Sequence, residues 1–217
     1  MTINSPTTQQ EDIDAMNAQI PSAIGDRISA GADSITSAND APGLAVGDQA
    51  PDFTLNDAIG NAVSLSELRS RGPVVLTFYR GEWCPYCNIQ LRHLEQALPS
   101  YLALGATLVA ISPQSPDHSL SLTEKHELKF PVLSDLDQSV IKAYKLQFTL
   151  SGDLEDLQVN VFQNDPATQN ADGSRTLPVP ATFVVDRQGV IRASFVNADW
   201  RVRVDPNDVL EVLESLQ

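Results

Sequence analysis

Cysteine is scarce in this sequence of 217 residues, which contains only Cys84 and Cys87. Neither a second Cys-x-x-Cys pair nor a His-x-His pair follows, and the three histidines are scattered, so a zinc site is disfavoured. A disulfide between residues so close in sequence would restrain the unfolded chain very little, which also disfavours a purely structural bond. We therefore interpret the two cysteines as a redox-active pair.

Long apolar runs are absent as well, and basic residues are few. No stretch approaches the roughly 20 apolar residues of a membrane span, and the first thirty residues lack the apolar segment of a signal peptide. The 14 basic and 28 acidic residues give a net charge of −14, which repels nucleic acid and anionic membranes. We expect a cytoplasmic protein without nucleic-acid or membrane partners, because a reducing compartment suits a catalytic cysteine pair.

The cysteine pair lies at the junction of a predicted strand and a predicted helix. Val74–Phe78 is an apolar, β-branched run typical of a buried strand, and apolar residues recur at helical spacing over residues 89–98. If the helix begins at Pro85, Cys84 occupies the cap, where backbone N–H groups and the helix dipole lower a cysteine pKa. Cys87 then lies one turn further along the same face, within the span of a disulfide.

Several motifs give the sequence a family resemblance. The run Cys84-Pro-Tyr-Cys87 is similar to the active-site motif of glutaredoxins. Three other segments resemble a peroxiredoxin-like branch of the alkyl hydroperoxide reductase/thiol-specific antioxidant family: Val46–Leu55, Phe130–Asp135 and Pro178–Asp186. The resemblance covers about residues 44–216. It implies an α/β protein with a thioredoxin-like fold, in which helices flank a central mixed sheet.

Two positions depart from the pattern that this resemblance implies. Peroxiredoxins usually carry Thr or Ser three residues before the reactive cysteine, where this sequence has Gly81. They also place an arginine near the start of the strand that corresponds to residues 182–185, where this sequence has Pro180 and Ala181. A proline at this position resembles the pattern found in thioredoxins. The resemblance to them implies that Pro180 faces the disulfide in the cis form and exposes backbone to a partner thiol.

The residues around the pair are assigned candidate roles. Cys84 is the candidate nucleophile, because the first cysteine lies nearer the exposed helix end, and Cys87 would resolve the sulfenic acid or mixed disulfide on Cys84. Trp83 and Tyr86 would flank the turn and offer a docking surface, although simple packing explains them equally well. Arg80 would stabilise the thiolate or replace the missing family arginine; the alternative is a solvated surface residue.

The rest of the chain divides into an extension and a catalytic domain. Apolar residues recur at helical spacing over residues 11–38 and are interrupted by Pro21, which predicts two amphipathic helices with Pro21 opening the second. We therefore expect an N-terminal tail and helical extension at 1–43 and a catalytic domain at 44–217. The helices would pack on this domain or against a second subunit, which leaves a homodimer open.

The alternation of strands and helices breaks off at about residues 146–177. This segment contains five acidic residues that are not spaced as in an EF-hand loop, so a solvated insertion is preferred to a calcium site. Its place before Pro180 would allow it to border Cys84 and shape access to the sulfur.

Three functions fit these observations. In the first, a thiol peroxidase uses Cys84 to reduce hydrogen peroxide or organic hydroperoxides, and Cys87 forms the disulfide. In the second, a thiol-disulfide oxidoreductase of the glutaredoxin or thioredoxin type uses the same pair, as Gly81 and Ala181 favour. The third is a non-enzymatic redox-sensing protein that uses the N-terminal helices as its partner surface. Neither enzyme would need a bound cofactor, because thioredoxin, glutaredoxin or glutathione would supply electrons.

Overall fold

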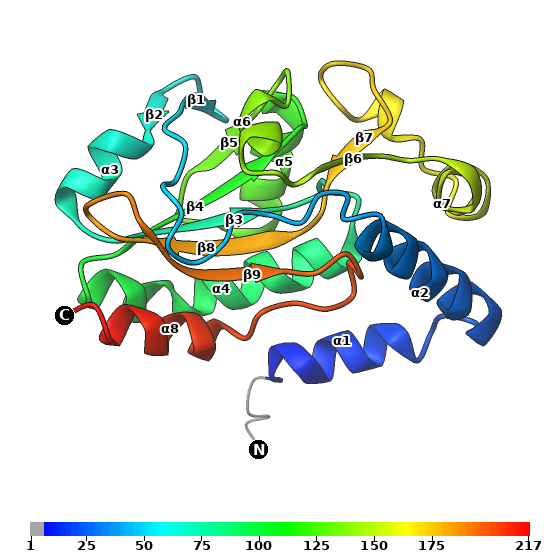
Figure 1. Cartoon of the computed structure of the whole chain (residues 1–217), viewed down its shortest axis with the longest axis horizontal. Coiled ribbons are helices and arrows are strands. Elements are labelled where there is room, and N and C mark those ends of the chain that lie inside the picture. The colour runs from blue at the N-terminus through cyan, green and yellow to red at the C-terminus, as the bar shows by residue number, and fades with distance from the viewer. Residues whose placement is uncertain (1–6) are drawn as a thin grey trace.

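A seven-stranded mixed sheet forms the centre of the protein (Figure 1). The structure, a computed structural model, describes residues 7–217, so residues 1–6 of the predicted tail lie outside the described residues. The strands are β1 (Thr54–Asp57), β2 (Ala62–Ser64), β3 (Val74–Phe78), β4 (Thr107–Ser112), β5 (Val132–Ser134), β8 (Ala181–Val185) and β9 (Ile191–Val196), in the spatial order β2-β1-β5-β4-β3-β8-β9. β3, β4 and β5 run parallel, and the other neighbouring strands pair antiparallel.

Helices cover both faces of the sheet. They are α1 (Gln9–Asn17), α2 (Ser22–Ser37), α3 (Leu65–Arg71), α4 (Pro85–Ala103), α5 (Pro116–His126), α6 (Ser139–Ala143), α7 (Gly152–Asp156) and α8 (Pro206–Glu214). In Figure 1, α4 and α8 lie along one face of the sheet, and α1 and α2 continue that layer beyond the end of the sheet. The predicted central mixed sheet with flanking helices is therefore confirmed.

Strand β3 divides the interior into two cores, because alternate residues of a strand point to opposite faces. Val75 joins the core shared with α4, α8 and the N-terminal helices. Val74, Leu76 and Phe78 join the core on the other face, together with residues of α3 and α6. Every residue of β3 is buried, as the apolar run predicts for a central strand between β4 and β8. The strand therefore fixes the point at which the cysteine loop leaves the sheet.

The two N-terminal helices pack on their own domain, as the first of the two predicted arrangements requires. Ile13 of α1 and Ile28 of α2 are buried in the core that contains α4. Asp12 Oδ2 lies 2.7 Å from His93 Nε2 on α4, which ties α1 to that helix. Pro21 stands directly before α2, so its predicted place at the start of the second helix is confirmed. The boundary predicted near residue 43 stays a prediction.

The acidic insertion predicted at about 146–177 is folded rather than a plain solvated loop. Strands β6 (Gln147–Thr149) and β7 (Thr176–Pro178) pair antiparallel in a small second sheet, and α7 is followed by a π-helical turn, Leu157–Val161. Leu157 and Leu177 are fully buried, whereas the acidic residues remain nearer the surface, where Asp165 and Glu155 pair with Arg175. The apolar residues between the acids explain the order of the segment.

If the buried side chains of α2 belong to the core of the domain, a cavity made at one of them must destabilise the whole protein. Ile28 has an exposed fraction of 0%. We expect Ile28→Ala to lower the free energy of unfolding by about 2–5 kcal/mol, because a large buried aliphatic side chain is lost. The matched control is Ile59→Ala, since Ile59 is 74% exposed, and its effect should stay within about 0.5 kcal/mol. Urea unfolding measures both; equal effects would mean that α2 is not docked in solution.

Candidate active site

The loop between β3 and α4 places Cys84 at the N-terminus of α4. Helix α4 begins at Pro85, and Cys84 is its N-cap residue with an extended backbone, φ −87° and ψ 111°. The Cys84 N–H donates to the carbonyl of Gly81 at 3.1 Å, and the Asn88 side chain donates to the carbonyl of Glu82 at 2.8 Å. These bonds fix the turn, so the predicted placement of Cys84 at the cap is confirmed.

The two cysteines are free thiols and are buried together. Their exposed fractions are 1% for Cys84 and 0% for Cys87, which lies one turn along α4. Burial by itself would raise the pKa of Cys84, but a hydrogen bond from Cys87 and the positive charges of Arg80 and Arg203 outweigh it and lower that pKa below 9.0. Burial and the neighbouring Cys84 raise the pKa of Cys87 well above 9.0. The surroundings therefore favour the thiolate at Cys84 and the thiol at Cys87.

Arg80 is buried, with an exposed fraction of 2%, so the alternative of a solvated surface residue is wrong. Its guanidinium lies between two indole rings, 4.9 Å from the centroid of Trp83 and 4.3 Å from that of Trp200. One nitrogen donates to Gln158 Oε1 at 2.8 Å. Cation–π contacts and this hydrogen bond replace part of the lost hydration of the guanidinium, which offsets some of the cost of burying its charge.

No carboxylate within residues 7–217 lies at ion-pair distance from Arg80. Burial lowers its pKa, whereas negative charge on Cys84 raises it. Arginine nevertheless stays protonated in proteins at neutral pH. The charge of Arg80 is therefore available to the Cys84 thiolate.

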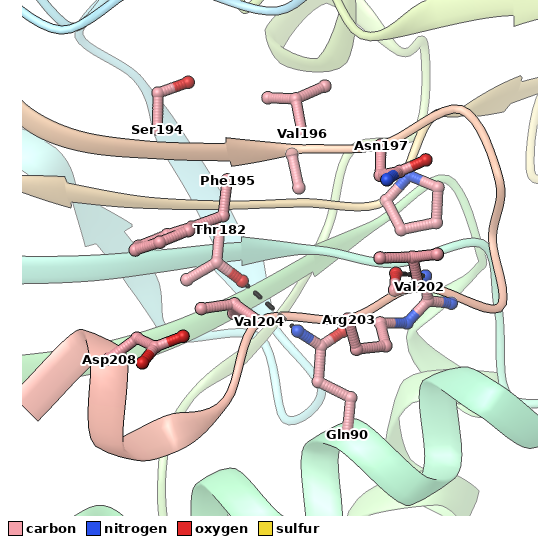
Figure 2. A pocket seen from close by; sticks show the side chains of 12 residues that line it. Gln90, Thr182, Ser194, Phe195, Val196, Asn197, Val202, Arg203, Val204 and Asp208 are labelled. Carbon is pink, nitrogen blue, oxygen red and sulfur yellow. Dashed lines mark hydrogen bonds between the residues drawn. The ribbon is translucent and has the colours of Figure 1, made fainter. Parts of the chain in front are cut away.

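Arg203 is a second cation at the pair, and no feature of the sequence singles it out. Its Nη2 donates to Cys87 Sγ at 3.4 Å. Arg203 follows β9 in sequence and lines a pocket of about 370 Å³ between β9 and α4 (Figure 2). In that view Gln90 of α4 points toward Thr182 of β8, to which its amide donates at 3.3 Å. No motif surrounds Arg203, so only the folded chain brings it to Cys87.

The aromatic residues beside the pair are packed side chains. The Tyr86 ring is buried, and its hydroxyl donates to Asn17 Oδ1 at 2.7 Å, which anchors the end of α1. Trp83 closes over Gly81: a Cβ atom at Gly81, where φ is 152°, would lie 2.4 Å from Trp83 Nε1. A Thr or Ser at this position would therefore collide with the indole. The glycine at position 81 is therefore required by Trp83, whose indole occupies the space that a larger side chain would need.

The prediction of a cis-proline at position 180 is wrong. Within residues 7–217, every peptide bond is trans, including the bond before Pro180. The Val179 N–H donates to the carbonyl of Leu146 at 2.8 Å, and Ala181 already pairs with Phe78 of β3. The chain passes in extended form from β7 into β8, and a trans peptide continues that direction. Pro180 lines the pocket that contains Arg203.

A second pocket, of about 420 Å³, opens over Cys84. The N-terminal helices, the cysteine loop and the insertion all contribute side chains to it. They are Met16, Gln19, Ile20, Ile28, Arg80, Trp83, Cys84, Pro85, Tyr86, Gln158, Phe162, Asn164 and Trp200. The prediction that the insertion borders Cys84 is confirmed. The N-terminal helices border it too, which their sequence did not indicate.

Two other kinds of site are not found in the described part of the chain. Residues 7–217 contain no group of three or more Cys, His, Asp and Glu side chains arranged to hold a metal ion. None of the helices in this range is both long enough and apolar enough to cross a bilayer.

Known proteins resemble this chain in sequence and in structure. A putative peroxiredoxin of Mycobacterium tuberculosis is 39% identical over 101 residues, which are 46% of this chain and 64% of that protein. A putative chloroplastic peroxiredoxin Q of Oryza sativa subsp. indica is 29% identical over 170 residues, 78% of this chain and 67% of that protein. The crystal structure of peroxidoxin BcpB from Mycobacterium tuberculosis superimposes with a TM-score of 0.63 at 22% identity, covering 80% of this chain and 99% of that chain.

The structural likeness confirms the thioredoxin-like fold. The matched region spans 64% of the length of the Mycobacterium tuberculosis relative named first. The sequence profile of the AhpC/TSA family matches residues 46–194, from the loop before β1 to the middle of β9. Because this match covers more than half of the 217 residues, the chain belongs to the AhpC/TSA family.

Proposed function

We propose that the protein is a thiol-dependent peroxidase in which Cys84 is the nucleophile and Cys87 the resolving residue. The observation that carries the proposal is the buried thiol pair at the N-terminus of α4, with two guanidinium groups directed to it. The Cys84 thiolate attacks one peroxide oxygen, the O–O bond breaks, and the departing oxygen leaves as water or an alcohol after taking a proton. Cys84 becomes a sulfenic acid.

In the second step Cys87 attacks the Cys84 sulfur. The Cys87 proton and the sulfenic hydroxyl leave as water, and an S–S bond forms. Two equivalents of an external thiol then restore both cysteines. Arg203, which donates to Cys87 Sγ, stabilises the negative charge that this sulfur must acquire before it attacks. Arg80 does the same for Cys84, and because Arg80 is buried, its charge acts where water is excluded, which strengthens its effect.

The two alternative functions are less well supported. Exchange with a protein disulfide would bring a bulky partner to a sulfur that is only 1% exposed, whereas a small peroxide reaches Cys84 through the pocket, so the first encounter is assigned to the peroxide. A redox-sensing protein would need the apolar faces of α1 and α2 as a partner surface, and Ile13, Ile28 and Ile35 of those faces are buried within the chain itself. The reducing chemistry of the cysteine pair suits the cytoplasm.

The external partners remain predictions. Thioredoxin, glutaredoxin or glutathione is proposed as the reductant, without a bound cofactor. A homodimer is also proposed, but it must use a surface other than the buried faces of α1 and α2. Turnover with each reductant and sedimentation velocity on the purified protein test these two proposals separately.

Replacement of each cysteine tests the assignment of roles. Cys84→Ser should abolish peroxide consumption, because a serine hydroxyl is not ionised at neutral pH and forms no sulfenic acid. Cys87→Ser should react once with peroxide and then accumulate oxidised Cys84. Intact mass should show a loss of about two daltons only in the wild-type protein, from the disulfide. If Cys84→Ser consumed peroxide at the wild-type rate, Cys84 would not be the nucleophile.

The charge of Arg80 should control the pH dependence of Cys84. Alkylation by iodoacetamide reports the thiolate, and in the wild-type protein its midpoint should lie below the ordinary cysteine value of about 8.5. Removing a positive charge raises a thiol pKa, so Arg80→Gln should slow alkylation at pH 6 by about tenfold or more. Because the thiolate is fully formed at high pH in both proteins, the rates should converge there.

The matched control for this experiment is Arg71→Gln, because Arg71 is an exposed residue at the end of α3. Its alkylation profile should coincide with that of the wild-type protein. An Arg80→Gln profile that also coincided with wild type would remove Arg80 from the proposed site, provided that circular dichroism shows the variant folded.

Arg203 should affect the resolving step more than the attack on peroxide. A hydrogen bond from a charged group is worth about 1.5–3 kcal/mol, so Arg203→Gln should slow disulfide formation by about tenfold to a hundredfold. Trapping with dimedone should reveal more sulfenic acid on Cys84, and mass spectrometry should reveal more overoxidised Cys84. Arg187→Gln, on the exposed turn between β8 and β9, is the control. Equal slowing of both steps would contradict a specific action on Cys87.

A further inference from the structure

We infer that Gln158 is a positioning residue for the proposed reaction: its neutral amide fixes the Arg80 guanidinium at the site and leaves the positive charge of Arg80 available to the Cys84 thiolate. The inference rests on the proposed function and assigns part of the control of Cys84 to the insertion at 146–177. Within residues 7–217 no hydrogen bond joins Gln158 to either cysteine, so its action on Cys84 passes through Arg80.

The hydrogen bond between Gln158 and Arg80 is enclosed by the protein. Gln158 is 3% exposed, and Arg80 Nη2 donates to its Oε1 at 2.8 Å. In the described part of the chain this oxygen is the single acceptor bonded to the Arg80 side chain, and Arg80 Nε has no partner. Cation–π attraction depends on the position of the charge over each indole ring, whereas a hydrogen bond also fixes the direction of an N–H group. The Gln158 bond therefore sets the orientation of the guanidinium.

The Gln158 amide is itself held in the orientation that this bond needs. Its Nε2 donates to the carbonyl of Asn164 at 3.3 Å. Because an amide nitrogen only donates and an amide oxygen only accepts, this contact directs the oxygen toward Arg80. The backbone is fixed as well: the Asn164 N–H donates to the Gln158 carbonyl at 3.0 Å, and the preceding Leu157 is buried in the core that contains α4. The π-helical turn thus presents Gln158 to Arg80 with its acceptor already placed.

The charges around Gln158 show what its neutrality achieves. The four acidic residues nearest to it in sequence all pair with arginines other than Arg80. The pairs are Arg27 with Asp153 and Asp156, and Arg175 with Glu155 and Asp165. A carboxylate at position 158 would form a buried ion pair with Arg80 and would compete with Cys84 for its positive charge. The amide supplies an acceptor without that competition.

Two variants of Gln158 separate the acceptor from the charge. Gln158→Met keeps an unbranched side chain but removes the acceptor, and Gln158→Glu keeps an acceptor but adds a negative charge. Iodoacetamide alkylation of Cys84 at a series of pH values, assigned by peptide mass spectrometry, reports the thiolate. At pH 6 we expect alkylation to slow by about threefold or more in Gln158→Met and by about tenfold or more in Gln158→Glu. The rates should converge with the wild-type rate at high pH.

The matched controls are Gln163→Met and Gln163→Glu, because Gln163 is an exposed glutamine of the same insertion and does not line the pocket over Cys84. Both should keep the wild-type alkylation profile. A wild-type profile in a folded Gln158 variant, or an equal shift in the corresponding Gln163 variant, would overturn the inference. Circular dichroism identifies the folded variants, and if only one Gln158 variant folds, its profile decides. Failure of both to fold would make Gln158 a structural residue and would also overturn the inference.

The action of Gln158 through Arg80 is tested in the Arg80→Gln protein. In that background Gln158→Met should change the alkylation rate at pH 6 by less than about twofold, because the guanidinium that Gln158 positions is gone. A slowing as large as that in the wild-type background would overturn the inference, since Gln158 would then act on Cys84 independently of Arg80.

Peroxide consumption separates this inference from the proposed function. A wild-type protein that consumes no peroxide, but whose alkylation profile shifts as expected in the Gln158 variants, would contradict the peroxidase and support the role of Gln158. A protein that consumes peroxide, but whose profile does not shift in those variants, would support the peroxidase and overturn the inference.

Discussion

A negative charge on a buried sulfur is the constraint on which the rest of the structure depends. Cys84 has almost no access to water, and burial by itself would keep it a neutral thiol. The helix terminus, the neighbouring Cys87 and two arginines reverse that preference. Arg80 is itself buried, and none of the carboxylates in residues 7–217 pairs with it, so each charge depends on the other. Removing one leaves the other uncompensated, which is costly in a protein interior.

This dependence explains why distant segments converge on one loop. Trp200 lies beyond the matched family segment and stacks on Arg80, while Gln158 of the insertion accepts its hydrogen bond. Arg203 reaches Cys87 from the connection between β9 and α8. The additions before residue 46 and after residue 194 are thus part of the electrostatic and apolar surroundings of the sulfur pair. A family segment alone would leave Arg80 without one of its two aromatic neighbours.

The sequence predicted those features of the site whose physical cause lies in neighbouring residues. Three features close to Cys84 in the sequence place it at a helix cap: Pro85, the apolar spacing of residues 89–98 and the buried run of β3. The burial of Arg80 was not predictable, because it depends on Trp200 and Gln158, which only folding brings near. Arg203 had no motif to single it out. The cis form of Pro180 was inferred from resemblance, and the extended path from β7 into β8 does not support it.

The buried position of Arg80 has a consequence for the oxidised protein. Formation of a Cys84–Cys87 disulfide removes the thiolate while the guanidinium stays enclosed by Trp83 and Trp200. The disulfide form therefore contains a cation without its counter-charge, whereas the dithiol form contains both. A pair whose reduced state is selectively stabilised has a higher reduction potential. If Cys84 and Cys87 cycle as proposed, the contacts that favour the Cys84 thiolate also make its return from the disulfide thermodynamically favourable, and a mild reductant suffices for it.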